Sequence, residues 1–82
     1  MLTVTRYTAN WCNPCKALSP VFNELERENP EVNFKTIDID IYKPEGVTSI
    51  PYVVIEKNGH IISQTTGIKP KNFYSTLIKA NL

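Results

Sequence analysis

The sequence has little excess charge, no long hydrophobic run and few cysteines. Lys and Arg number 9 against 8 Asp and Glu, which leaves a formal net charge of +1. This balance gives no electrostatic basis for binding a nucleic-acid backbone or an anionic membrane surface. No apolar run approaches the roughly 18 residues that a transmembrane helix needs. We therefore expect neither nucleic acid nor a membrane as a partner.

A secretory signal is also missing from the start of the sequence. Residues 1–9 lack a cationic segment followed by an apolar one, so a cytoplasmic location is expected. The chain has 82 residues, of which 41% are hydrophobic and 21% charged, as in ordinary globular domains. A chain of this length has room for one hydrophobic core, so we expect a single domain over residues 1–82.

The two cysteines, Cys12 and Cys15, are too few for most cysteine-based architectures. A disulfide across so short a loop contributes only about 2 kcal/mol, which argues against a structural staple. With His60 as the only histidine, four zinc ligands are not present in one chain, although two chains could share a metal. Haem attachment would need a histidine where Lys16 stands. In a reducing compartment, a redox-active dithiol is the remaining interpretation.

Local signals predict the secondary structure. Asn58-Gly59 between two β-rich runs indicates a hairpin. Before an apolar 3.6-residue pattern, Asn13 is a candidate N-cap and Pro14 suits the first helical turn. The segment 41–49, with Pro44 and Gly46, is expected to be a loop. The predicted strands cover residues 2–8, 32–40, 51–56 and 60–65, and the predicted helices cover about 14–28 and the stretch from Pro70 to the C-terminus.

These elements define an α/β fold of order β-α-β followed by β-β-α. The first helix connects two strands that should be parallel, and the hairpin supplies antiparallel pairs. We therefore expect a four-stranded mixed sheet flanked by helices. Apolar residues occupy both faces of the strand at 32–40, which predicts that this strand is covered on both sides.

The position of Cys12 just before a helix explains how it could react. Backbone N–H groups and the helix dipole at that end should lower the pKa of the Cys12 thiol below its ordinary value of about 8.5. Cys15, one turn into the helix, should be more buried. Cys12 would then attack a substrate disulfide, and Cys15 would attack Cys12 to release the reduced substrate. Trp11 is either a core residue or an apolar lip over this site.

Several of these motifs together resemble the thioredoxin family, and the short chain is similar to the small thioredoxins and glutaredoxins of phages and archaea. The resemblance implies a minimal thioredoxin fold in which Pro51 is a cis-proline that faces the disulfide. The motifs are Trp11-Cys12-Asn13-Pro14-Cys15-Lys16, Pro20, Ser49-Ile50-Pro51, Lys57-Asn58-Gly59 and Gly67. The implied substrate groove consists of Trp11, Asn13, Pro14, Ile50, Pro51, Gly67 and Ile68.

The sequence departs from this family in four places. The leading strand and helix are missing, the segment 41–48 is shorter, and Asn13 stands where the family has glycine. The family's buried aspartate, six residues before the first cysteine, corresponds to Arg6. Arg6 is either a solvated side chain or a positive charge that favours the thiolate. Lys16 is by default a solvated residue and a second candidate for such tuning.

By resemblance, the chain is a monomeric protein-disulfide reductase that binds no cofactor. Electrons would come from a thioredoxin reductase with NADPH, and ribonucleotide reductase is one candidate substrate. The first alternative is a glutaredoxin-like reductase that uses glutathione, although Thr66-Gly67-Ile68 lacks the paired glycines and following acid of the usual glutathione site. The second is a non-catalytic binding subunit with the same fold.

Overall fold

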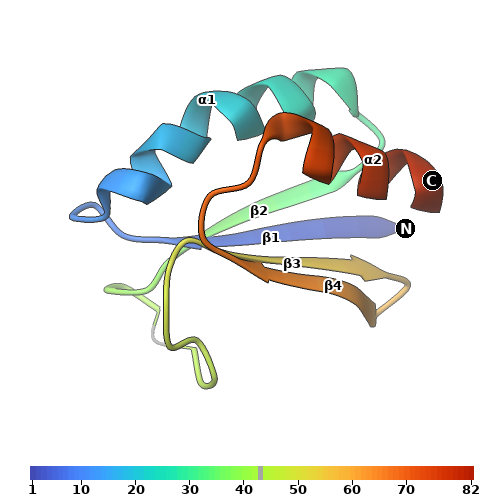
Figure 1. The fold of residues 1–82 in the computed structure, drawn as a ribbon. Coiled ribbons are helices and arrows are strands. Elements are labelled where there is room, and N and C mark those ends of the chain that lie inside the picture. Colours follow the sequence, from blue (N-terminus) through green and yellow to red (C-terminus); the bar gives the residue numbers. More distant parts are fainter. Residues whose placement is uncertain (43) are drawn as a thin grey trace.

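The structure is a computed structural model that describes residues 1–42 and 44–82. One four-stranded sheet, of strand order β2-β1-β3-β4, carries two helices (Figure 1). β1 pairs with β2 in parallel, whereas β1 with β3 and β3 with β4 are antiparallel. This is the predicted α/β fold with a mixed sheet. The elements are β1 (Leu2–Thr8), α1 (Asn13–Glu28), β2 (Asn33–Asp38), β3 (Tyr52–Lys57), β4 (His60–Thr66) and α2 (Lys71–Asn81).

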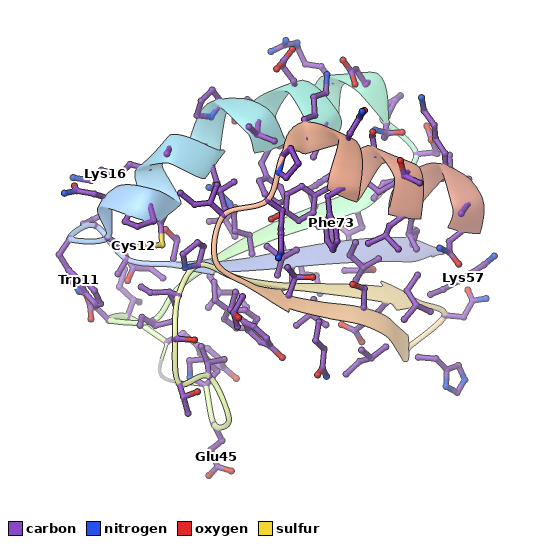
Figure 2. The ribbon with its side chains drawn as sticks, in the orientation of Figure 1. Trp11, Cys12, Lys16, Glu45, Lys57 and Phe73 are labelled. Atoms are coloured by element: carbon purple, nitrogen blue, oxygen red, sulfur yellow. A yellow bond between two sulfur atoms is a disulfide. The ribbon has the colours of Figure 1, made fainter. Side chains whose placement is uncertain are left out.

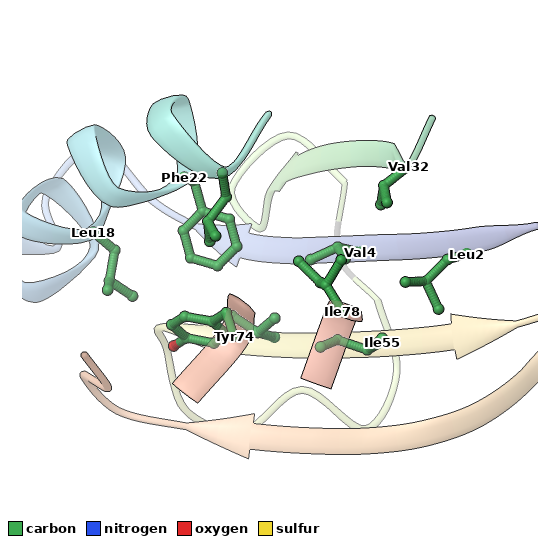
Figure 3. Close-up of a cluster of buried hydrophobic side chains, with 10 residues drawn as sticks. Leu2, Val4, Leu18, Phe22, Val32, Ile55, Tyr74 and Ile78 are labelled. Atoms are coloured by element: carbon green, nitrogen blue, oxygen red, sulfur yellow. The ribbon is translucent and has the colours of Figure 1, made fainter. Parts of the chain in front are cut away.

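The hydrophobic core lies between the sheet and the helices (Figure 3). β1 is a central strand whose alternate side chains, Leu2 and Val4, point to this core. α1 contributes side chains spaced three or four residues apart, as an amphipathic helix requires. Tyr74 of α2 packs on Phe22 of α1 with ring centroids 5.0 Å apart. The buried cluster comprises Leu2, Val4, Leu18, Phe22, Leu25, Val32, Val53, Ile55, Tyr74 and Ile78.

Both helices cover the same face of the sheet (Figure 1). The sheet is therefore flanked by helices, as predicted, and both helices lie on one of its faces. On the other face, Tyr7 and Tyr52 lie opposite each other in the register, with ring centroids 5.5 Å apart. Thr5 and Val54 are buried beside them. Antiparallel sheets commonly leave one face to solvent in this way, with larger side chains sheltering smaller neighbours.

β2 differs from the prediction in position and cover. It spans Asn33–Asp38 instead of 32–40 and lies at the edge of the sheet, where Lys35 is exposed. The expectation of a strand covered on both sides was wrong. Two of the apolar residues on which that expectation rested lie outside the strand. Val32 joins the core before β2 begins, and Ile39 packs against the cysteines after β2 ends.

The hairpin between β3 and β4 has the predicted two-residue turn. Asn58 and Gly59 both have positive φ, 53° and 85°, as a type I′ turn requires. The amide N–H of Asn58 donates to the carbonyl of Met1 at 2.9 Å, and the Asn58 side chain accepts from the N-terminal amine. These contacts tie the turn to the start of β1.

The loop before β3 agrees with its prediction as far as it is described. Residues 41–42 and 44–49 form turns, bends and irregular backbone, while Lys43 lies outside the described residues. α1 continues through the exposed Pro20, whose missing N–H leaves one helical hydrogen bond unmade. In the part of the chain that the structure describes, neither helix has the length and apolarity to cross a bilayer.

An ion pair joins the C-terminal half of α1 to the start of α2. Lys71 Nζ donates to Glu28 Oε2 at 2.6 Å and lies 3.6 Å from Glu24 Oε1. The hydrogen bond is the main cause that lowers the pKa of Glu28 and raises the pKa of Lys71 from their ordinary values of 4.5 and 10.5. The pair therefore contributes to stability between these two values, and its contribution is lost as the pH falls below 4.5 or rises above 10.5.

Replacing Glu28 by glutamine should lower the urea midpoint of unfolding at neutral pH, by a small amount because the pair is exposed. The difference from the wild type should vanish in acid, where the wild-type carboxylate is also protonated. Glu31→Gln is the matched control, since Glu31 has no ion-pair partner among the described residues. Equal midpoints for Glu28→Gln and the wild type at neutral pH would show that the pair is not stabilising.

Candidate active site

The two cysteines form a disulfide at the N-terminal end of α1 (Figure 2). The Cα atoms of Cys12 and Cys15 are 5.2 Å apart. Cys12 is 5% exposed to solvent, whereas Cys15 is fully buried. Cys12 is thus the only one of the two that a substrate could reach without movement of the chain, which is the predicted asymmetry.

Cys12 is the N-cap of α1, so the prediction of Asn13 as the N-cap was wrong by one residue. The backbone of Cys12 is extended, with φ −90° and ψ 102°, and its Sγ accepts a hydrogen bond from the Cys15 N–H at 3.2 Å. Such a sulfur lies at the positive end of the helix dipole, beside N–H groups that have no partner within the helix. The first turn of α1 contains no acidic residue. After reduction, this environment favours the thiolate of Cys12 over the thiol.

The disulfide packs against a small apolar cluster that is separate from the main core. Ala9 is buried with the two cysteines, and the partly buried Ile39 and Ile50 pack against them. The Ile50–Pro51 peptide bond is cis, as the resemblance implies. The Gly67 N–H donates to the Pro51 carbonyl at 2.9 Å, with Gly67 at φ 81°. This bond joins the residue that follows β4 to the residue that precedes β3.

Trp11 forms an exposed lip beside the disulfide. Figure 2 shows its side chain directed away from the core, at the same end of the molecule as Cys12. It is 65% exposed, and its Nε1–H donates to Asp40 Oδ2 at 2.8 Å. Of the two interpretations of Trp11, the core position is therefore wrong. The hydrogen bond fixes a large apolar surface next to Cys12.

A hollow of about 230 Å³ lies between Trp11 and Ile50. It includes these two of the predicted groove residues. The other predicted groove residues do not line it: Asn13, Pro14 and Gly67 are exposed, Pro51 is buried, and Ile68 is 58% exposed. A larger hollow, of about 740 Å³, contains neither cysteine and lies under the loop beside Tyr7 and Ile37. The smaller hollow lies next to the disulfide, because Ile39 and Ile50 both line it and pack against the cysteines. It is lined by Trp11, Ile39, Val47, Thr48, Ser49 and Ile50.

Ile39 and Asp40 are among the residues of this site that sequence reasoning missed. Ile39 packs against the cysteines, and Asp40 holds Trp11. A signal for both was present. The carboxyl ends of parallel strands meet at the same edge of a sheet, so residues just after β2 lie near residues just after β1. The cysteine loop follows β1, and Ile39 and Asp40 follow β2.

Arg6 is half-buried, so the expectation of a solvated side chain was wrong. Its Nη1 donates to Ser19 Oγ at 3.2 Å, and its guanidinium carbon lies 5.1 Å from the centre of the Phe22 ring. Burial lowers the pKa of Arg6 below its ordinary value, and the charge of Glu26 partly offsets this. Lys16 and His60 are exposed. Across residues 1–42 and 44–82, no three His, Cys, Asp or Glu side chains are grouped to hold a metal ion.

The chain is similar to thioredoxins over almost its whole length. The Thioredoxin family profile matches residues 1–80. A thioredoxin of Mycoplasmoides gallisepticum is 34% identical over 80 residues, which are 93% of this chain and 80% of the relative. A thioredoxin of Bacillus subtilis is 33% identical over 82 residues, covering 93% and 78%. The X-ray structure of Fasciola hepatica thioredoxin superposes with a TM-score of 0.85 at 28% identity, covering 99% of this chain and 81% of that one.

The comparisons and the geometry of the site point to the same family. The relatives are similar in sequence, and the solved structure has the same fold. A disulfide between cysteines three positions apart lies at the start of a helix. An accessible sulfur backed by a buried one is the arrangement that dithiol exchange requires. The chain therefore belongs to the thioredoxin family and is a thiol–disulfide oxidoreductase that reduces protein disulfides.

Proposed function

We propose that Cys12 is the attacking thiol of this reductase and Cys15 the resolving thiol. The observation that carries the assignment is the N-cap position of Cys12, whose sulfur accepts the Cys15 N–H while keeping the only exposed surface of the pair. A thiolate is the nucleophile in disulfide exchange, and this position stabilises a thiolate before attack.

The exchange proceeds in two balanced steps. The Cys12 thiolate attacks one substrate sulfur, so a Cys12–substrate disulfide forms and the other substrate sulfur leaves as a thiolate that takes a proton from water. Cys15 then loses its proton and attacks Cys12 Sγ. The Cys12–Cys15 bond forms, and the second substrate sulfur leaves and is protonated. Two electrons pass from the dithiol to the substrate, and proximity favours the second step.

The residues around Cys12 would bind the substrate chain. Trp11 and Ile50 supply apolar surface on one side of the sulfur, and the backbone around the cis Pro51 supplies groups for an extended segment. Gly67 and Ile68 would form the opposite side, with Asn13 and Pro14 at the rim. Lys16 adds one exposed positive charge near the helix start.

Family membership supports a proposal for the electron donor as well. A thioredoxin reductase with NADPH would return two electrons to the Cys12–Cys15 disulfide, with no cofactor bound to this chain. The protein would act as a cytoplasmic monomer within one domain, and ribonucleotide reductase is a candidate among its substrates. Glutathione is the second candidate donor.

A coupled assay tests the reductase and its donor together. Insulin disulfides serve as the substrate, with either NADPH and thioredoxin reductase or glutathione and glutathione reductase as the source of electrons. Turnover in the first system alone is the expected result. Turnover with glutathione alone would overturn the proposed donor in favour of the glutaredoxin-like alternative.

The third possibility is a binding subunit that needs no dithiol. Replacing both Cys12 and Cys15 by serine should abolish activity in the coupled assay. The replaced protein should also fail to support any growth phenotype that the wild-type protein supports. A phenotype that survives the double replacement would contradict the reductase role in the cell.

Replacing Trp11 by alanine should raise the KM for insulin about tenfold, because a large aromatic at the centre of a contact surface is the residue most often worth more than 1 kcal/mol. Reduction of a small aromatic disulfide should change by less than about twofold, since it needs only the sulfur. Tyr42→Ala is the control, as Tyr42 is also an exposed aromatic but lines the other hollow. Equal KM values for Trp11→Ala and Tyr42→Ala would remove Trp11 from the binding surface.

A further inference from the structure

Arg6 is half-buried on the helix-facing side of β1. The strand alternates, so Arg6 shares its face with Val4, which belongs to the main core. Its guanidinium reaches α1, where it contacts Ser19 at 3.2 Å and the Phe22 ring at 5.1 Å. A permanent positive charge is thus inserted between the sheet and the first helix.

The residue that binds this charge, Ser19, is one helical turn from the buried cysteine. Ser19 follows Cys15 by four residues, and side chains at this spacing are neighbours on a helix, about 5–6 Å apart at Cβ. The strand that carries Arg6 also runs on to Ala9, which packs directly against both cysteines. Arg6 is therefore linked to the dithiol along two elements, through Ser19 on α1 and through Ala9 at the end of β1.

The charge of Arg6 is poorly compensated. Its Nε is buried and finds no hydrogen-bond partner within the described ranges, and the hydrogen bond that its Nη1 donates goes to a neutral hydroxyl, that of Ser19. Both ion pairs that the described residues make involve Lys71 instead. Burial lowers the pKa of Arg6, which means that the surroundings solvate its charge less well than water does.

The groups that could respond to this charge can be named. On α1 they are Glu26, which acts on Arg6 without forming an ion pair, the exposed Lys16, and Cys15 once reduced; Cys12 lies just before the helix. On α2, Tyr74 packs on Phe22, the ring that Arg6 contacts, and burial raises the pKa of Tyr74. Of these groups, Cys15 must become an anion inside the protein during the exchange.

We propose that Arg6 is a positioning residue that stabilises the thiolate of Cys15 and so favours the reduced state of the dithiol. The inference rests on the roles proposed for the two cysteines. The guanidinium already carries its proton and cannot act as the base. Its role is electrostatic: when Cys15 gives its proton to water and attacks Cys12 Sγ, the positive charge lowers the cost of the intermediate anion.

The direct test measures the ionisation of Cys15 alone. In a Cys12→Ser background, the ultraviolet absorbance of the Cys15 thiolate is recorded against pH, with and without Arg6→Met. A poorly compensated positive charge about one helical turn from a thiol changes the ionisation constant of that thiol on the order of tenfold. The midpoint should therefore move up by about one pH unit in Arg6→Met. Arg6→Gln should give the same shift, and Arg6→Lys, which keeps the charge, should stay near the parent.

A second measurement uses both cysteines and no protein substrate. The reduced and oxidised forms are equilibrated with dithiothreitol at a pH above the measured midpoint, and Arg6→Met should hold about tenfold less of the reduced form relative to the oxidised one. Because insulin is absent, this result is independent of whether the chain reduces proteins with the proposed donor.

The control is Arg27→Met, which removes an exposed positive charge from the last turn of α1. It should leave both measurements unchanged. Superimposable curves for Arg6→Met and its parent would overturn the proposal. A shift in Arg6→Lys as large as that in Arg6→Met would also overturn it, because it would assign the effect to packing instead of charge.

Discussion

Replacing Cys12 by serine is expected to reduce insulin reduction by a thousandfold or more. A serine hydroxyl is not ionised at neutral pH and cannot form the mixed disulfide, so no later step can compensate. Cys15 cannot take over, because its side chain is fully enclosed. The rate is measured in the coupled assay with NADPH and thioredoxin reductase, after circular dichroism has shown that the variant is folded.

Cys15→Ser is the matched variant, and it should fail differently. The first step remains, so the variant should accumulate a covalent complex with its substrate through Cys12, visible on a non-reducing gel and located by mass spectrometry. Complexes that form through Cys15 in the Cys12→Ser protein, and not through Cys12, would reverse the two roles. The trapped complexes would also identify the natural substrates.

Tyr74→Ala is expected to cost about 3–5 kcal/mol of stability, as large aromatic truncations in a core do. Tyr74 has no exposed surface and packs between Phe22 of α1 and Phe73 of α2. A domain of 82 residues has roughly 4–12 kcal/mol in total. The variant should therefore be largely unfolded or unfold at low urea, which denaturation followed by circular dichroism would measure.

Tyr74→Phe separates packing from the hydroxyl. The Tyr74 hydroxyl is buried without a side-chain or backbone partner that meets hydrogen-bond geometry among the described residues. Removing an unpaired buried polar atom should leave stability unchanged or raise it slightly. A loss in Tyr74→Phe comparable to that in Tyr74→Ala would show that the hydroxyl, and not the ring, holds the helices together.

The elements with strong local signals were predicted closely. The first strand has the predicted limits, and the Asn58-Gly59 turn is placed correctly, because the left-handed backbone of this turn selects those residue types wherever the hairpin lies. The helix start at Asn13-Pro14 is of the same kind. The active disulfide was predictable because its chemistry depends on two residues and the helix that follows them.

Features that depend on distant neighbours were predicted less well. The cover of β2 depends on where the helices pack, and the sequence pattern does not reveal that both helices lie on one face of the sheet (Figure 1). The burial of Arg6 depends on α1 crossing above it, and the exposure of Trp11 depends on a hydrogen bond to Asp40, 29 positions away. Propensity and periodicity describe single segments, whereas these features arise only when segments pack together.

The fluorescence of the exposed Trp11 indole should also report the redox state of the disulfide. Trp11 is the only tryptophan of the chain, it directly precedes one sulfur of the disulfide, and Asp40 fixes its ring nitrogen. A disulfide accepts an electron from an excited indole and quenches its emission, whereas a dithiol does so weakly. The intrinsic fluorescence of the unlabelled protein should thus brighten on reduction, and every turnover can be followed in real time from a single side chain.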